Sequence, residues 1–195
     1  MKIVAITGTI GSGKTTLANI IKDLGYVVYD VDSWVRRLYQ KKNFIDIIDK
    51  NFSGIVVDGK VKKRDLRNIV FGDNNKLKKL ESLIHPFLRK VLKNLIWKNT
   101  KYNDLFFIDI ALLFEMKWDK YCDFIILADA QYDVCMKRVM QRDNISKKDF
   151  EKIIKTQISN KDKEEFSDVV VDTDKPINML RVELIKLIES INNGC

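Results

Sequence analysis

The sequence predicts an α/β fold, with a parallel sheet of five strands and helices on both faces. Five short apolar runs read as buried strands, at about residues 2–7, 26–29, 106–109, 124–127 and 169–171. Between them apolar residues recur at helical spacing, and strands that alternate with helices form parallel sheets. A chain of 195 residues, 46% of them apolar, suffices for one domain with a sizeable core.

The first strand leads into Gly8-Thr9-Ile10-Gly11-Ser12-Gly13-Lys14-Thr15, which fits the P-loop pattern G-x-x-x-x-G-K-S/T. A helix at about 14–24 follows and ends at Gly25. Strand, glycine-rich turn and helix form the setting in which this pattern binds phosphates. Glycines let the backbone approach a polyphosphate, and N–H groups at a helix start face an anion. A glycine-rich turn that only joins a strand to a helix is the alternative.

The residue types of the loop predict a nucleoside triphosphate site. Lys14 supplies positive charge for the β- and γ-phosphates, and the Thr15 hydroxyl is a ligand for Mg²⁺, which prefers hard oxygen donors. Thr16 is a candidate hydrogen-bond partner of the α-phosphate. We therefore expect ATP and Mg²⁺ here, with ATP bound by Gly11, Ser12, Gly13, Lys14, Thr15 and Thr16.

The second strand ends at Asp30-Val31-Asp32. In a doubly wound sheet we expect this strand beside the P-loop strand. Asp32 can accept a proton from an attacking hydroxyl or hold a water on Mg²⁺, and it can also cap the helix predicted from residue 33 to about 50. We favour the functional role for Asp32 and leave Asp30 open.

Residues 33 to 103 separate the second and third strands, far more than a crossover needs. A hairpin at Asp58-Gly59 and a helix near 63–71 are expected within them. Pro86 interrupts a later apolar stripe, so we expect a new helix to begin there with His85 as its cap. Such an insertion belongs at the carboxyl edge of the sheet, where open α/β sheets bind ligands.

The C-terminal half contributes further candidates. Asp109 ends the third strand and resembles a Walker B acid, which holds a magnesium water, but it could equally cap the next segment. Helices are expected at about 131–142, 147–160 and 177–191, the second opened by a capping box at Ser146 and Asp149. Arg138 and Arg142 are four residues apart on one predicted helix, so they share a face. Arginines from a mobile segment can neutralise charge on a transferring phosphoryl group, although a solvent-facing pair has the same spacing.

Composition bounds the remaining possibilities. The formal net charge is +8, but the lysines are scattered among acids, which favours a solvated surface over a nucleic-acid site. Three cysteines without C-x-x-C spacing and a single histidine argue against zinc or a disulfide framework. No apolar stretch is long enough to span a membrane, and Met1 leads directly into the first strand, which leaves no room for a signal peptide. We expect a cytoplasmic protein without nucleic-acid, membrane or obligate protein partners.

Further patterns follow one another along the chain: Thr7 to Thr16 (T-G-G-I-G-S-G-K-S/T-T), Asp30 to Arg36 (D-A-D-x-x-A-R), Asp58 to Val61 with Leu66 to Phe71 (D-G-x-L, L-R-x-x-V-F), Leu80 to Pro86 (L-E-x-L-x-H-P), Ala111 to Glu115 (P-L-L-F-E), Arg138 to Asp143 (R-x-x-x-R-D) and Ser167 to Thr173 (A-D-x-x-I/V-D-N). Together they resemble the dephospho-coenzyme A (dephospho-CoA) kinase family over nearly the whole chain. Ala111, where the family has proline, is one of several departures, and none removes a group that the chemistry requires.

The resemblance implies a P-loop NTPase fold that transfers the ATP γ-phosphoryl group to the ribose 3′-hydroxyl of dephospho-CoA, the last step of CoA biosynthesis. It implies one kinase domain, with a core at about 1–32 and 104–195, a CoA-binding insertion at about 33–103 and a lid at about 138–160. Asp32 would be the base, and Lys14 with Mg²⁺ would neutralise the transferring group. Arg138 and Arg142 would lie in or beside the lid. Arg36, Arg64 and His85 would contact the substrate, as would Asp32.

Two alternatives remain open. The first is another small P-loop kinase, such as a shikimate or nucleoside monophosphate kinase, because shikimate kinases also carry D-x-D after the first helix. Their acceptor subdomain is shorter, and His85-Pro86 followed by Leu112-Leu113-Phe114-Glu115 is not their signature. The second is a nucleotide-switched or nucleic-acid-binding P-loop module, supported only by the net charge of +8.

Overall fold

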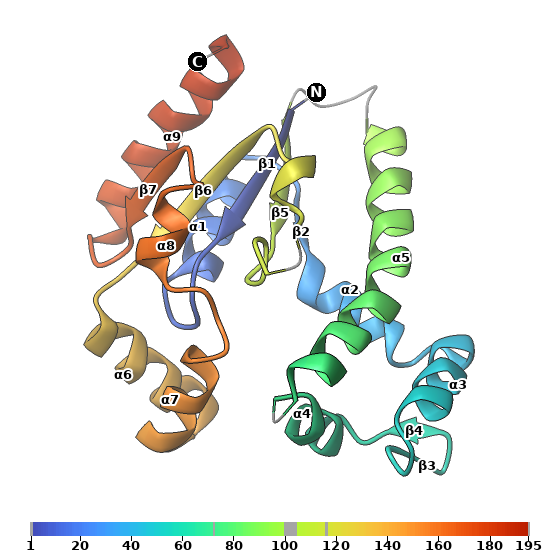
Figure 1. Cartoon of the computed structure of the whole chain (residues 1–195). Helices are drawn as coiled ribbons and strands as arrows, with labels where there is room; N and C mark the ends of the chain where they lie inside the picture. Colours follow the sequence, from blue (N-terminus) through green and yellow to red (C-terminus); the bar gives the residue numbers. More distant parts are fainter. Residues whose placement is uncertain (1, 72, 100–104, 116, 195) are drawn as a thin grey trace. The chain divides into compact units, whose positions relative to one another are not determined.

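The computed structural model describes residues 2–71, 73–99, 105–115 and 117–194 (Figure 1). The chain comprises two compact units. One consists of Met1–Asp30 and Asn99–Cys195, and the other is Val31–Lys98.

The first unit contains the parallel sheet. Its strands are β1 (Lys2–Thr7), β2 (Val28–Asp30), β5 (Leu105–Asp109), β6 (Phe124–Asp129) and β7 (Val169–Asp172), in the order β2-β5-β1-β6-β7. All four neighbouring pairs are parallel, so the predicted five-stranded sheet is confirmed.

The strand order corrects one expectation, because β5 lies between β2 and the P-loop strand β1. Burial explains the order. The first four residues of β5, Leu105 to Ile108, are buried, as an inner strand requires. The shorter β2 leaves Tyr29 and Asp30 half-buried, which suits a position at the sheet edge.

Helices α1 (Lys14–Asp23) and α9 (Ile177–Asn193) pack against one face of the sheet (Figure 1). Leu17 and Ile21 of α1 and Leu184 of α9 are fully buried in one core cluster with strand residues such as Val4 and Phe107. Burying each such side chain stabilises the fold by about 1.5–3 kcal/mol. A short 3₁₀ helix, Asp119–Tyr121, precedes β6.

Three helices connect β6 to β7. They are α6 (Tyr132–Asp143), α7 (Lys147–Ile154) and α8 (Asn160–Glu164). Ser146 accepts a hydrogen bond from the Asp149 N–H at 3.2 Å, so the predicted cap is confirmed. The prediction of a single helix over 147–160 is wrong, because α7 ends at Ile154. Ser159 then caps α8 in the same way, accepting the Asp162 N–H at 3.2 Å.

The second unit contains α2 (Val31–Leu38), α3 (Lys42–Asn51), the hairpin strands β3 (Val56–Val57) and β4 (Lys60–Val61), α4 (Lys63–Phe71) and most of α5 (Asn74–Asn99). The predicted hairpin is confirmed, with Asp58 and Gly59 at φ +50° and +68°, as a tight hairpin turn requires. The predicted helix over 33–50 is divided instead. Buried Leu38 and Phe44 are six residues apart, a spacing that one helix cannot place on one face.

The expectation that a helix begins at Pro86, with His85 as its cap, is wrong because α5 runs through both residues. Buried Leu80, Ile84 and Leu88 form one stripe on either side of the exposed proline. Proline inside a helix costs ~3 kcal/mol, and burial of three such side chains outweighs that cost. Among the described residues no helix is both long and apolar enough to cross a membrane.

Candidate active site

The P-loop folds around two glycines in the left-handed conformation, Gly11 at φ +83° and Gly13 at φ +87°. Space also excludes side chains there. A Cβ atom on Gly11 would lie 2.6 Å from the Cys135 carbonyl oxygen, and one on Gly13 would lie 2.5 Å from Thr173 Oγ1. The loop backbone therefore packs directly against α6 and the residue after β7, and only glycine fits both the angle and the contact.

The first three residues of α1 carry the ammonium and hydroxyl groups that the sequence assigns to phosphate and metal. Lys14 Nζ donates to the carbonyl oxygens of Gly8 at 2.9 Å and Thr9 at 3.2 Å, so the ammonium lies over the loop. The Thr15 side chain is exposed, and Thr16 is half-buried. All three groups lie at the positive end of α1, which favours a bound anion.

Two acidic residues end the adjacent strands β2 and β5 on one side of β1. Asp30 in β2 and Asp109 in β5 are register partners, and Asp109 is also the register partner of Ile6 in β1. Within the described ranges no cluster of three or more His, Cys, Asp or Glu residues has the arrangement of a metal site. Mg²⁺ sites commonly combine one or two protein oxygen ligands with waters and substrate phosphates. Thr15 with carboxylates at this edge fits that donor set.

The two candidate arginines have different surroundings. Arg138 donates to the Thr173 carbonyl at 2.9 Å and to the Gly11 carbonyl at 3.4 Å, so it reaches the P-loop. Arg142 is exposed and forms two hydrogen bonds with Asp143, at 2.8 and 2.7 Å. These bonds raise the pKa of Arg142 and lower the pKa of Asp143. The structure thus brings Arg138, but not Arg142, to the phosphate loop.

Thr173 was given no role by sequence reasoning, yet it connects three parts of the site. Its hydroxyl contacts the carbonyl oxygens of Ser12 at 2.8 Å and Asp129 at 3.1 Å, and it accepts from Arg138 at 3.2 Å. Its buried position follows β7 directly, so the end of that strand could have indicated it.

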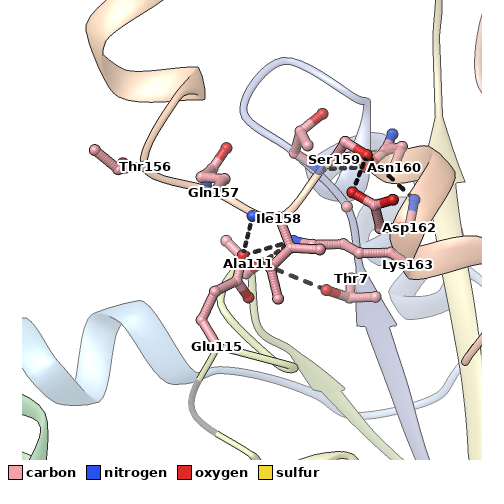
Figure 2. Close-up of polar contacts among 12 residues, drawn as sticks. Thr7, Ala111, Glu115, Thr156, Gln157, Ile158, Ser159, Asn160, Asp162 and Lys163 are labelled. Atoms are coloured by element: carbon pink, nitrogen blue, oxygen red, sulfur yellow. Dashed lines mark hydrogen bonds and ion pairs between the residues drawn. The ribbon is translucent and has the colours of Figure 1, made fainter. Parts of the chain in front are cut away.

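A second set of missed residues lies in Gln157–Lys163, which we call the strap (Figure 2). Asn160 Oδ1 accepts the Thr9 N–H at 2.9 Å, and Gln157 Oε1 accepts the Ile10 N–H at 2.8 Å. The side chains of two residues in the strap thus hold the opening half of the P-loop. The spacing of Ser159 and Asp162, a capping pattern, was the available signal for the helix break that allows this.

Lys163 is fully buried, whereas lysine side chains are ordinarily exposed. Its Nζ lies 3.2 Å from Glu115 Oε1 and donates to the Ala111 carbonyl at 3.1 Å (Figure 2). Burial lowers the pKa of Lys163, and the Glu115 carboxylate opposes that shift. Sequence reasoning missed this pair, because a lysine within a run of charged residues such as Lys161 to Glu165 is normally exposed to solvent.

The other candidates lie in the second unit, on three helices. Asp32 is the second residue of α2, and Arg36 is exposed in the last turn of the same helix. Arg64 is exposed at the start of α4, and His85 is half-buried in the middle of α5.

Comparison with known proteins assigns the chain to a family. The family model described as dephospho-CoA kinase matches residues 2–178. The chain belongs to the dephospho-CoA kinase family. A dephospho-CoA kinase from Fusobacterium nucleatum is 34% identical over 97% of this chain and 98% of its own length. One from Bartonella quintana is 33% identical over 98% of each chain.

Solved structures agree on the fold. A crystal structure of a Thermus thermophilus protein matches with a TM-score of 0.87 and 29% identity, over 97% of both chains. Shikimate kinase from Aquifex aeolicus matches with a TM-score of 0.54 at 16% identity, over 99% of both chains, and shares the fold alone. The predicted P-loop kinase fold and family are therefore confirmed. A dephospho-CoA kinase is favoured over a shikimate or nucleoside monophosphate kinase.

Proposed function

We propose that this chain transfers the γ-phosphoryl group of ATP to the ribose 3′-hydroxyl of dephospho-CoA, giving CoA and ADP. The observation that carries the proposal is a complete P-loop, with Lys14 over it, in a chain that matches the dephospho-CoA kinase family over residues 2–178. We place this reaction, the last of CoA biosynthesis, in the cytoplasm, and its proposed partners are ATP and dephospho-CoA alone.

The P-loop and the start of α1 bind the triphosphate in this proposal. Backbone N–H groups from Gly11 to Thr16 donate to the phosphates at the positive end of α1. Lys14 leaves the carbonyl oxygens of Gly8 and Thr9 and follows the transferring group, whose negative charge it neutralises. Arg138 already reaches the loop through Gly11 and supplies a second positive charge.

Mg²⁺ would be held by the Thr15 hydroxyl, with Asp30 and Asp109 at the ends of the neighbouring strands as the nearby acids. When bound, the ion would offset the negative charge of the phosphates. The protein residues orient the triphosphate for in-line transfer. The proposed lid at about 138–160, which includes the end of α6 and all of α7, excludes water that would otherwise hydrolyse ATP.

The acceptor is assigned to the second unit, proposed as the CoA-binding insertion. Asp32 takes the proton of the 3′-hydroxyl as general base. Arg36, Arg64 and His85 contact dephospho-CoA, whose pyrophosphate is a natural partner for arginine.

A turnover assay tests the proposal. With ATP and Mg²⁺ we expect the purified chain to phosphorylate dephospho-CoA, and to leave shikimate and nucleoside monophosphates unchanged. Turnover of another acceptor without turnover of dephospho-CoA would overturn the proposed function.

Asp32→Asn tests the assignment of the base. It should lose most of kcat, about 10²–10⁴-fold, while the Kd for ATP barely changes, because general-base catalysis contributes to the chemical step. Steady-state kinetics and calorimetry with ATP measure the two quantities. A parallel loss of ATP affinity would instead place Asp32 on the magnesium side.

A further inference from the structure

Two backbone N–H groups of the P-loop are already occupied by protein side chains. Thr9 and Ile10 precede Gly11, and their N–H groups donate to Asn160 and Gln157. Buried backbone donors require a partner, and in a loop that partner is commonly a ligand or water. Here the strap provides it, so protein side chains hold the opening half of the loop.

The orientation of the Asn160 amide is fixed at both ends. Its Nδ2 donates to Asp129 Oδ1 at 2.5 Å and to the Ala128 carbonyl at 3.3 Å, both at the end of β6. A rotated amide would place its oxygen against these acceptors and its nitrogen against the Thr9 N–H. Asn160 therefore presents an acceptor, and only an acceptor, to the P-loop.

A buried ion pair fastens the strap to the segment that follows β5. One oxygen of Glu115 lies 3.2 Å from Lys163 Nζ, near the C-terminal end of the strap, and accepts the Ile158 N–H at 2.9 Å near its N-terminal end (Figure 2). Lys163 also donates to the Ala111 carbonyl. Removing one partner of a buried pair leaves an uncompensated charge, so this anchor resists displacement.

We propose that Gln157 and Asn160 are positioning residues for ATP, which hold the P-loop in its phosphate-binding shape while the Lys163–Glu115 pair keeps the strap in place. The inference rests on the proposed ATP site. A loop that adopts the binding shape only part of the time has a higher apparent Kd for its ligand. The apparent Kd equals the intrinsic Kd divided by the fraction of molecules in that shape. The strap removes that loss before ATP arrives.

Gln157→Met tests the proposal, because it keeps the side-chain length and removes the acceptor for the Ile10 N–H. We expect the Kd for ATP to rise about fivefold, the factor that corresponds to a hydrogen bond worth ~1 kcal/mol. The KM for dephospho-CoA should stay unchanged. Asn160→Leu, which removes the acceptor for Thr9, should raise the Kd for ATP at least as much.

Ile188→Val is the matched control, because it removes one methyl group from the buried face of α9 and so lowers stability at a position away from the loop. It should lower the unfolding midpoint and leave the Kd for ATP unchanged. If folded Gln157→Met behaves in the same way, the strap is merely structural and the inference is wrong. Should Asn160→Leu fail to fold, Gln157→Met decides alone. Calorimetry with ATP needs no acceptor, so it tests the inference whether or not the wild type phosphorylates dephospho-CoA. A wild type that fails to phosphorylate dephospho-CoA would refute only the proposed function.

Discussion

The two units of the chain hold their candidate residues in different ways. In the first unit, the P-loop is fixed by close contacts: Gly13 against Thr173, Arg138 on the Gly11 carbonyl, and Asn160 on the Thr9 N–H. In the second unit, Arg36 and Arg64 are exposed side chains on helices. The P-loop of the first unit is held by packing and hydrogen bonds, whereas the second unit presents long basic side chains at the surface.

This difference teaches where specificity and rate arise in the proposed reaction. A site fixed by packing uses little binding energy to order itself, so changes there should reduce ATP binding and the rate together. An exposed arginine has a high side-chain entropy, which an acceptor must overcome when it binds. Changes in the second unit, Asp32 aside, should therefore alter the KM for dephospho-CoA and leave ATP unaffected.

Among variants of the first unit, the largest effect is expected for Lys14→Ala. Because the ammonium neutralises charge that develops on the transferring group, its loss should reduce kcat by about 10²–10³-fold. Steady-state kinetics with both substrates measures it. A change confined to the KM for ATP would show that Lys14 contributes only ground-state binding.

Gly13→Ala should have the next largest effect. Its left-handed backbone alone costs about 1–2 kcal/mol for alanine, and the new Cβ would also collide with Thr173, which holds the Ser12 carbonyl. Gly25→Ala is the matched control, since Gly25 has φ +94° and no neighbour within 4 Å. Urea unfolding should show a greater loss for Gly13→Ala, and only this variant should bind ATP more weakly. Equal losses in both variants would show that the contact with Thr173 relaxes freely.

The sequence predicted features that depend on neighbouring residues. The P-loop, its glycines and the five strands follow from local spacing and short apolar runs, and all are present. The order of the strands was not predictable in the same way, because β5 enters between β1 and β2 from far along the chain. The prediction that a helix begins at Pro86 failed for a related reason. Burial of Leu80, Ile84 and Leu88 along one stripe stabilises a continuous helix by more than one proline destabilises it.

Much of the candidate site could not be predicted from the sequence, because its contacts join residues that are far apart along the chain. Asn160 and Gln157 contact the P-loop across 151 and 147 residues, and a side chain bonded to a distant backbone leaves no periodic pattern. Lys163 is of a residue type that is ordinarily exposed, yet its side chain is fully buried. The roles of Asp32, Arg36, Arg64 and His85 stay predictions, since they rest on the family patterns.

The two arginines of α6 provide a comparison within the first unit. Arg138→Lys keeps the charge but cannot bond the carbonyls of both Thr173 and Gly11, so we expect kcat/KM for ATP to fall about tenfold. Arg142→Lys alters only an exposed pair with Asp143 and should change kcat/KM for ATP less than about twofold. Kinetics under subsaturating ATP compares the two. An equal loss in both would mean that Arg142 reaches ATP when the lid closes.

Arg64→Ala should have a small effect and the most selective one. Arg64 is exposed at the start of α4, where solvent weakens a charge-assisted bond to the acceptor's pyrophosphate. The KM for dephospho-CoA should therefore rise about three- to tenfold. Lys78→Ala removes the same charge from an exposed position of α5 and is the matched control. An equal rise in both variants would assign the effect to the field of the net charge of +8, and salt would then abolish it. A rise in the KM for ATP would instead contradict the inference that changes in the second unit leave ATP binding unaffected, because the exposed arginine would then act on the nucleotide.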